Sequence, residues 1–303
     1  MKKYKNIILT VVLVIFLLNI DLVIKSVNDS CILFFNKIFV SVFPFIILSD
    51  ILLYYDYHLF LEKIFGKTLS KLFNVKKSTS IIFILSLLTC APNNAIYIKD
   101  MLERNEIDIN EAERILTYTS FSSISFVIGT IGVYLYKSII IGLILWLIIL
   151  LNNILIGISL RNKKTISNSN AITNNKQISN IFLLLKESTI KGINTSFIIL
   201  GNLIVFSIMI NLFLKYIHLN NIISSIIIGF IEMTNGIIMT SNLNISLLSK
   251  IFITSFILTF SSMSVLFQSF SILSNYKINI KKILIIKLVF SLFYLLMSII
   301  FLI

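Results

Sequence analysis

Long apolar segments separated by short polar ones set the pattern of this chain. Nine apolar segments can be recognised, and a helix needs about 20 apolar residues to cross a bilayer. They cover residues 6–24, 31–55, 79–98, 115–136, 138–160, 193–217, 221–241, 251–274 and 283–303. The strict alternation of apolar and polar residues that is typical of membrane barrels is absent. The pattern predicts an all-α polytopic membrane protein.

Two of these segments are interrupted by polar and turn-forming residues. Residues 90–94 read Cys-Ala-Pro-Asn-Asn, and Pro92 removes a backbone donor and disfavours helix in the residue before it. Residues 232–236 read Glu-Met-Thr-Asn-Gly and interrupt an isoleucine-rich run. Interrupted segments at matching positions in two halves of a chain are a sequence pointer to the binding site of a transporter.

A short motif also occurs twice, once after each interruption. Residues 121–127 read Phe-Ser-Ser-Ile-Ser-Phe-Val, and residues 260–266 read Phe-Ser-Ser-Met-Ser-Val-Leu. The order of interrupted segment and serine motif is therefore the same in both halves. This repetition indicates an internal repeat.

The distribution of basic residues favours interrupted segments that enter and leave on the same side of the membrane. If all nine segments crossed fully, the loop 161–191 with its six basic residues would lie outside, against the positive-inside rule. With two re-entrant segments, the inside regions hold 20 of the 26 basic residues. Those regions are 1–5, 56–78, 98–114, 161–191 and 277–282.

This layout predicts seven full transmembrane helices plus two re-entrant broken segments, arranged as inverted-topology repeats. Residues 1–30 form a first helix outside the repeat, and residues 31–160 form the first repeat. Residues 161–187 form a polar cytoplasmic linker, and residues 188–303 form the second repeat. Each repeat holds three full crossings, and an odd number of crossings inverts the second relative to the first. Residues 59–75 read as an amphipathic helix at the inner interface.

Composition narrows the function classes. The chain is 57% hydrophobic and 13% charged, which is too apolar for a soluble fold. The net charge is +13, and the basic residues lie in loops beside apolar spans, where they face lipid headgroups. Membrane lipid is therefore expected as a partner, and nucleic acid is not. The two cysteines have no metal-ligand spacing, and no nucleophile–base pair can be placed. We therefore expect no enzyme, no metal and no cofactor.

Glu232 is the most informative acidic residue. Acids at membrane depth are costly and are candidates for function by default. In a functional role, Glu232 binds a proton or cation, or holds the broken helix open. In a structural role, it pairs with Lys287 or caps a helix end.

The remaining candidates surround the interruptions and the serine motifs. Asparagine side chains cap helices and bind ligands, and two half-helix N-termini that point at one site would favour an anion. The serines either allow close helix packing or line a polar path. Gln268 follows Ser264 by four residues, on the same helix face. The candidate substrate-binding residues are Pro92, Asn93, Asn94, Ser123, Glu232, Thr234, Asn235, Gly236, Ser262 and Gln268.

The order of these features resembles the sporulation integral membrane protein YlbJ family, whose members carry nucleoside-recognition Gate segments. The resemblance covers about residues 31–300. It is carried by Ser-Val-Phe-Pro-Phe at 41–45, the break at Pro92, Glu-Ala-Glu-Arg at 111–114, Gly-Phe-Ile-Glu-Met-Thr-Asn-Gly at 229–236, and Ser264-Val265 with Gln268. The first break departs from the family pattern, because residues 90–95 replace a glycine-rich stretch.

The resemblance implies an integral membrane protein of a spore-forming bacterium that transports a small organic anion. The implied anion is dipicolinate, and the implied location is the outer forespore membrane. Two alternatives stay open. One is a nucleoside-type or other solute carrier on the same scaffold, and the other is a membrane scaffold of spore assembly that transports nothing.

Overall fold

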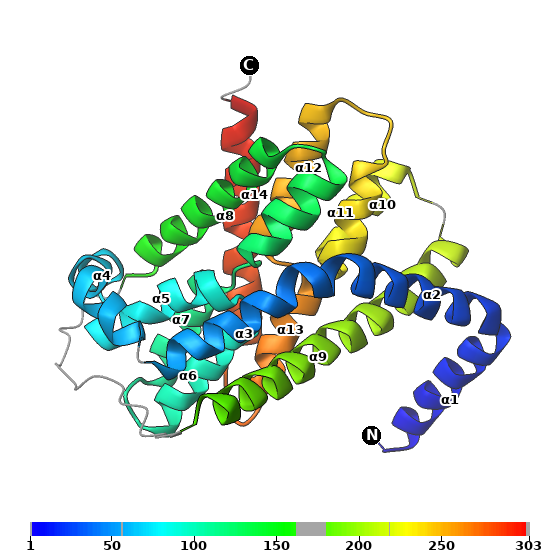
Figure 1. Cartoon of the computed structure of the whole chain (residues 1–303). Coiled ribbons are helices and arrows are strands. Elements are labelled where there is room, and N and C mark those ends of the chain that lie inside the picture. The colour runs from blue at the N-terminus through cyan, green and yellow to red at the C-terminus, as the bar shows by residue number, and fades with distance from the viewer. Residues whose placement is uncertain (1, 56, 162–179, 218, 301–303) are drawn as a thin grey trace.

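The computed structural model describes residues 2–55, 57–161, 180–217 and 219–300 (Figure 1). All regular elements in these ranges are helices, which confirms the predicted class. The α-helices are α1 (Lys2–Leu18), α2 (Ile20–Leu33), α3 (Val40–Tyr54), α4 (Tyr57–Phe73), α5 (Lys77–Thr89), α6 (Asn93–Glu103), α7 (Ile109–Thr119), α8 (Ile139–Ser159), α9 (Ile181–Tyr216), α10 (Asn221–Ile231), α11 (Met233–Ser241), α12 (Leu247–Phe260), α13 (Met263–Ile272) and α14 (Ile280–Ile300). Two wider π-helices are η1 (Phe34–Phe39) and η2 (Phe126–Leu135). The predicted amphipathic helix is α4.

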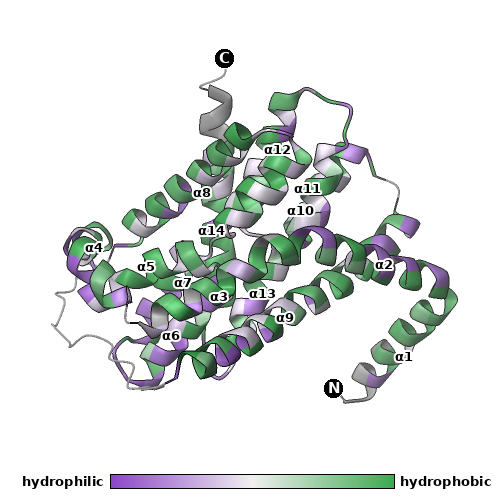
Figure 2. Ribbon diagram, in the orientation of Figure 1, coloured by the Kyte–Doolittle hydropathy of each residue, from purple (hydrophilic) through white to green (hydrophobic). Residues whose placement is uncertain are grey.

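Helix length and hydropathy are those of a helical membrane protein. In the described residues, three helices are long and apolar enough to span a bilayer, or up to five if each bent pair counts as one span. The three are α8, α9 and the run Leu247–Ile272 formed by α12 and α13. Hydrophobic residues also cover the outer surface of the bundle, whereas hydrophilic ones gather at α4, α6 and the helix ends (Figure 2). The predicted total of seven full spans and two re-entrant segments stays a prediction.

Helix α8 illustrates how sequence separates the outer surface from the interior. Leu143, Leu147, Leu151 and Leu155 recur every four residues and are all between 43% and 58% exposed. The opposite face carries buried Leu145, Ile149, Asn152, Asn153 and Ile156. The exposed leucine face packs against no other part of the protein, so it is suited to contact lipid, whereas the two asparagines face the protein interior.

The first apolar segment, 6–24, is not a single helix. Helix α1 ends at Leu18, and the axis turns by 84° before α2. The Asn19 side chain donates to the Ile15 carbonyl at 2.8 Å, so it competes for the last backbone acceptors of α1. Beyond the turn, helix runs on through α2, η1 and α3 to Tyr54, so the predicted boundary at residue 30 lies inside a helical run.

Helix α9 is 36 residues long and therefore about 54 Å in length. It starts at Ile181, so the last residues of the predicted linker are helical, while residues 162–179 lie outside the described part. The helix packs along α2 and α3 (Figure 1). At one end, Asn19 accepts from Lys215 at 2.5 Å and from Tyr216 at 3.2 Å.

At the other end of this contact, polar groups of α3 and α9 also meet. The Asp50 carboxylate accepts from Ser188 at 2.7 Å and forms an ion pair with Lys191. The contact between α9 and the α2–α3 run is thus polar at both ends, and one further polar pair lies between them, since Asn211 donates to Ser26 at 2.8 Å.

Besides the turn at Asn19, helical structure is interrupted inside apolar segments at four places in the described chain: 90–92, 120–123, 232 and 261–262. The first and third are the predicted interruptions. The other two are corrections, because 115–136 and 251–274 were each predicted as an uninterrupted helix. Both coincide with the Phe-Ser-Ser motif, where serine hydroxyls compete for backbone groups. Ser123 accepts from Phe126 N, while Ser261 and Ser262 have positive φ values of 71° and 47°.

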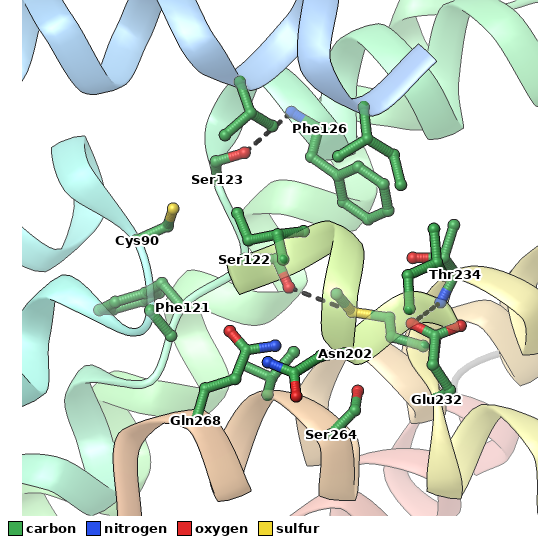
Figure 3. Close-up of a pocket in the computed structure, with 17 residues that line it drawn as sticks. Cys90, Phe121, Ser122, Ser123, Phe126, Asn202, Glu232, Thr234, Ser264 and Gln268 are labelled. Carbon is green, nitrogen blue, oxygen red and sulfur yellow. Dashed lines mark hydrogen bonds between the residues drawn. The ribbon is translucent and has the colours of Figure 1, made fainter. Parts of the chain in front are cut away.

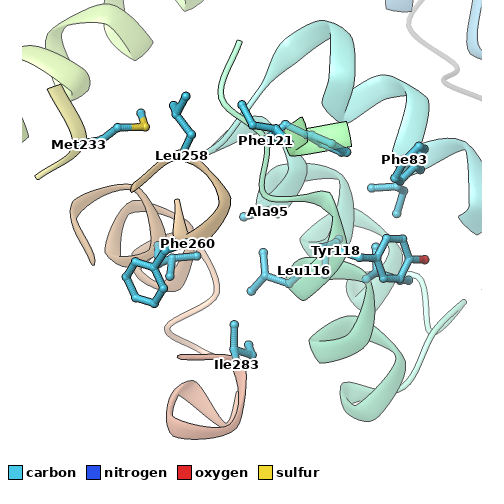
Figure 4. Close-up of a cluster of buried hydrophobic side chains, with 14 of the residues drawn as sticks. Phe83, Ala95, Leu116, Tyr118, Phe121, Met233, Leu258, Phe260 and Ile283 are labelled. Atoms are coloured by element: carbon cyan, nitrogen blue, oxygen red, sulfur yellow. The ribbon is translucent and has the colours of Figure 1, made fainter. Parts of the chain in front are cut away.

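One large apolar cluster joins the two halves of the sequence (Figure 4). The Tyr118 ring stacks on Phe73 with centroids 4.7 Å apart, and Phe83 meets Phe121 edge-on at 5.2 Å. Phe260, Met233, Leu258 and Ile283 from the second half belong to the same cluster. In lipid such close packing, rather than exclusion of water, holds helices together. The two Phe-Ser-Ser motifs are therefore anchored by their phenylalanines.

Candidate functional site

The helix breaks surround a cavity of about 80 Å³ (Figure 3). Residues from both halves of the chain and from α9 line it. Its apolar wall includes Val42, Phe121, Phe126 and Met233. Its polar side chains are Ser122, Ser123, Asn202, Glu232, Thr234, Ser264 and Gln268. An apolar chamber with a few polar groups has the composition of a small-molecule site.

Glu232 lies at the cavity and caps α11. One carboxylate oxygen accepts from Thr234 N at 3.0 Å, and the other accepts from Asn235 N at 2.7 Å. The side chain is buried, with the residue only 5% exposed. The positive end of the α11 dipole and these two donors stabilise the carboxylate inside the protein. Of the two structural roles expected for Glu232, the helix cap is present.

The alternative pairing of Glu232 with Lys287 is not formed. The Lys287 ammonium instead donates to the Ser120 carbonyl at 3.4 Å and to the Ser261 hydroxyl at 3.0 Å. An acid and a base inside apolar segments suggest an ion pair when only the sequence is known. In the structure, Glu232 is stabilised by the start of α11, and Lys287 by the ends of α7 and α12.

The chain reverses direction at Glu232. A Cβ built on Gly236 would lie 2.1 Å from the Cα of Gly229. In an unbroken helix, residues seven apart are separated by about 10 Å. Helices α10 and α11 therefore form a hairpin whose backbones touch. The helix resumes at Met233, so the break is narrower than the predicted 232–236, and Thr234, Asn235 and Gly236 form the first turn of α11.

The first Phe-Ser-Ser motif faces the tip of this hairpin. The Ser122 hydroxyl contacts the Met233 sulfur at 3.3 Å, which joins the two halves beside the cavity (Figure 3). Ser123 lies within 3.3 Å of Ser125 and accepts from Phe126 N at 3.1 Å. Ser123 thus both lines the cavity and starts η2.

The second motif leaves a helix start without a side-chain cap. Ser262 precedes α13, but its hydroxyl is paired with that of Ser264 at 3.1 Å and caps no backbone N–H. Ser264 and Gln268 lie on the cavity side of α13, as their spacing predicts. The start of α13 is therefore a positive helix end beside the cavity.

The first interruption, residues 90–94, contributes two residues to the cavity wall and two to the packing next to it. Cys90 and Ala91 line it, whereas Asn93 donates to the Thr89 carbonyl at 3.0 Å. Asn94 is fully buried and reaches Thr119 at 3.3 Å. These two asparagines tie the start of α6 to α5 and α7.

The ten predicted site residues therefore divide into two groups. Ser123, Glu232, Thr234 and Gln268 line the cavity. The other six are next to the breaks but are not among the lining residues: Pro92, Asn93, Asn94, Asn235, Gly236 and Ser262. Participation of either group in ligand binding stays a prediction.

Asn202 and Ser122 are cavity residues outside the predicted set. Asn202 is on α9, and its side chain points into the cavity opposite α13, where Gln268 is located (Figure 3). The sequence could have indicated Asn202, because it is a polar residue inside the apolar segment 193–217 and such residues usually face the bundle interior. Ser122 belongs to the first serine motif, and the sequence alone does not show which serines of that motif line the cavity.

The comparisons with known proteins identify one similar protein. The chain is 24% identical to the sporulation integral membrane protein YlbJ of Bacillus subtilis (strain 168), in an alignment that covers 84% of this chain and 72% of that protein. No family model matches the chain, and no solved structure matches it. The similarity supports the resemblance drawn from the motifs and is consistent with a membrane role in sporulation.

Proposed function

Because the chain is assigned to the YlbJ family of sporulation integral membrane proteins, we propose that it transports a small organic anion across a membrane during sporulation. The first candidate is dipicolinate, in the outer forespore membrane. The observation that carries the proposal is the cavity at which the helix breaks of both halves meet. Transporters built from repeats bind substrate where discontinuous helices converge.

The proposed architecture has seven full spans, two re-entrant segments and two inverted repeats. The hairpin of α10 and α11 supports a re-entrant second segment, because its chain reverses at Glu232. The break between α5 and α6 is the matching feature of the first repeat. The positions of the basic loops support the same layout. The cavity then lies between the repeats, where alternating access needs it.

The polar groups at the cavity suit a carboxylate. Asn202 and Gln268 supply amide donors, and Ser122 and Ser264 supply hydroxyls. The uncapped start of α13 adds a positive helix end. The charge of Glu232 is already matched by two backbone donors. Phe121 and Phe126 give the flat apolar wall that an aromatic dicarboxylate such as dipicolinate needs.

Replacing both Asn202 and Gln268 with leucine should reduce dipicolinate uptake at least about tenfold. Leucine keeps much of the volume but removes two donors, and a hydrogen bond to a charged group contributes about 1.5–3 kcal/mol. The measurement is uptake of labelled dipicolinate into liposomes that contain the purified protein. The control is Asn211→Leu on the same helix, which removes a hydrogen bond to Ser26 instead. Equal uptake by the double variant and this control would contradict a role for the two amides.

The function itself is tested in a spore-former that lacks its own copy of this protein. Spores with the chain restored should contain dipicolinate, and spores without it should be depleted. The purified chain should take up dipicolinate rather than nucleosides. Uptake of nucleosides alone would favour the nucleoside carrier, and uptake of neither by correctly folded protein would favour the scaffold.

A further inference from the structure

Helix α14 places a lysine in the interior of the bundle. Lys287 is 0% exposed, and its ammonium donates to the Ser120 carbonyl at 3.4 Å and the Ser261 hydroxyl at 3.0 Å. The Ser261 hydroxyl donates to the same carbonyl at 3.0 Å. Among the ion pairs of the described residues, none involves Lys287. A buried ammonium at membrane depth is costly and needs a compensating environment.

That environment consists of two helix ends. Ser120 follows the last residue of α7, and Ser261 follows the last residue of α12. The C-terminal end of a helix carries partial negative charge and unpaired carbonyl groups. Lys287 therefore lies where two such ends converge from opposite halves of the chain. In transporters with broken helices, carbonyls and helix C-termini of this kind hold a coupling cation.

The helices packed on α14 supply no counter-ion for Lys287. They are α7, α8 and α12, and α8 contains no charged residue. On α7, Glu113 is engaged with Lys282 at 2.9 Å, and Arg114 donates to the Leu160 carbonyl. On α12, Lys250 donates to the Ser241 carbonyl. Glu111, in the first turn of α7, is more than two helical turns from Ser120.

We propose that the ammonium of Lys287 is a built-in cation that takes the place of a coupling metal ion. It holds the ends of α7 and α12 together, two residues before Ser122 and three before Ser264 of the cavity. Its charge also favours an anion in the cavity. The inference rests on the proposed transport function and adds to it that transport requires neither sodium nor potassium.

The first experiment measures dipicolinate uptake into liposomes with and without metal cations. The wild-type chain should take up dipicolinate equally in sodium chloride and in N-methylglucamine chloride. Lys287→Met should lose uptake at least about tenfold, since it removes the charge and keeps the length. Lys287→Arg should keep more uptake than Lys287→Met. Lys281→Met, at an exposed position of the same helix, should match the wild type.

Two results of that experiment would overturn the inference. One is a wild-type chain that stops transporting without sodium or potassium. The other is Lys287→Met transport at the wild-type rate in metal-free buffer.

A second experiment needs no substrate, so it separates this inference from the proposed function. Lys287→Ala should vacate the space between the two helix ends, and methylammonium should bind there. The unfolding midpoint of the purified variant should then rise by about 5 °C with methylammonium chloride but not with choline chloride. The wild type should respond to neither salt. A Lys287→Ala variant as stable as the wild type and indifferent to both salts would show that no cation is needed at this position.

Discussion

Replacing Gly236 with alanine should destabilise the protein by about 3 kcal/mol, the upper range for overpacking a tight contact. The new Cβ would lie 2.1 Å from the Cα and 2.3 Å from the N of Gly229. Both are backbone atoms of α10, so no side-chain rotation can relieve the overlap, and the hairpin must open. The measurement is thermal or denaturant unfolding of the purified protein, together with its amount in the membrane.

Gly201→Ala is the matched control for this change. Gly201 also lies inside a helix, α9, and nothing is within 4 Å of a Cβ added there. Since glycine is a poor helix former, this control should be neutral or gain about 0.5–1 kcal/mol. If Gly236→Ala unfolds at the same temperature as Gly201→Ala, then α10 and α11 do not touch at this point.

The second large effect is expected at Glu232. Glu232→Gln should accumulate in the membrane but reduce transport by about a hundredfold, which leaves spores without dipicolinate. A glutamine has one acceptor oxygen, so it keeps one of the two bonds to Thr234 N and Asn235 N and loses the charge. Charge-assisted bonds contribute about 1.5–3 kcal/mol each. The start of α11, which positions Thr234 at the cavity, is then no longer fixed.

Protein amount, dipicolinate content and uptake should be measured for the same strains. Glu187→Gln is the control, because Glu187 is an exposed acid on α9 outside the cavity. Normal dipicolinate content in the Glu232→Gln strain would remove Glu232 from the transport mechanism and leave it a structural cap.

Local signals in the sequence were sufficient for the helical class and for two of the breaks. Apolar runs of about 20 residues indicate helices whatever their neighbours are. Pro92 cannot donate a backbone hydrogen bond, and an acid inside an isoleucine run is costly unless the helix ends there. Those features act within a few residues, so their effect can be predicted without the fold.

The breaks at the serine motifs could not be predicted in this way. Serine is tolerated inside membrane helices, where its hydroxyl bonds to a carbonyl one turn earlier. Here Ser261 instead donates to the carbonyl of Ser120, 141 residues away in sequence. The break exists because two distant segments meet, and the same reason explains why Lys287 binds there rather than to Glu232. A helix break occurs at each copy of the doubled motif, and the structure of the second break depends on a tertiary contact.

The polar contacts at both ends of α9 fix how it lies against α2 and α3. One turn of helix is 5.4 Å, so a slip of α9 by a single turn would break the bonds of Asn19 and those of Asp50 at once. A mismatch at one end cannot be corrected at the other, since the helices between them are continuous. Helix α9 and the α2–α3 run are therefore held in a single register and form a rigid part of the bundle. In a transporter of this design, a change of access falls to the short helices that end at the cavity.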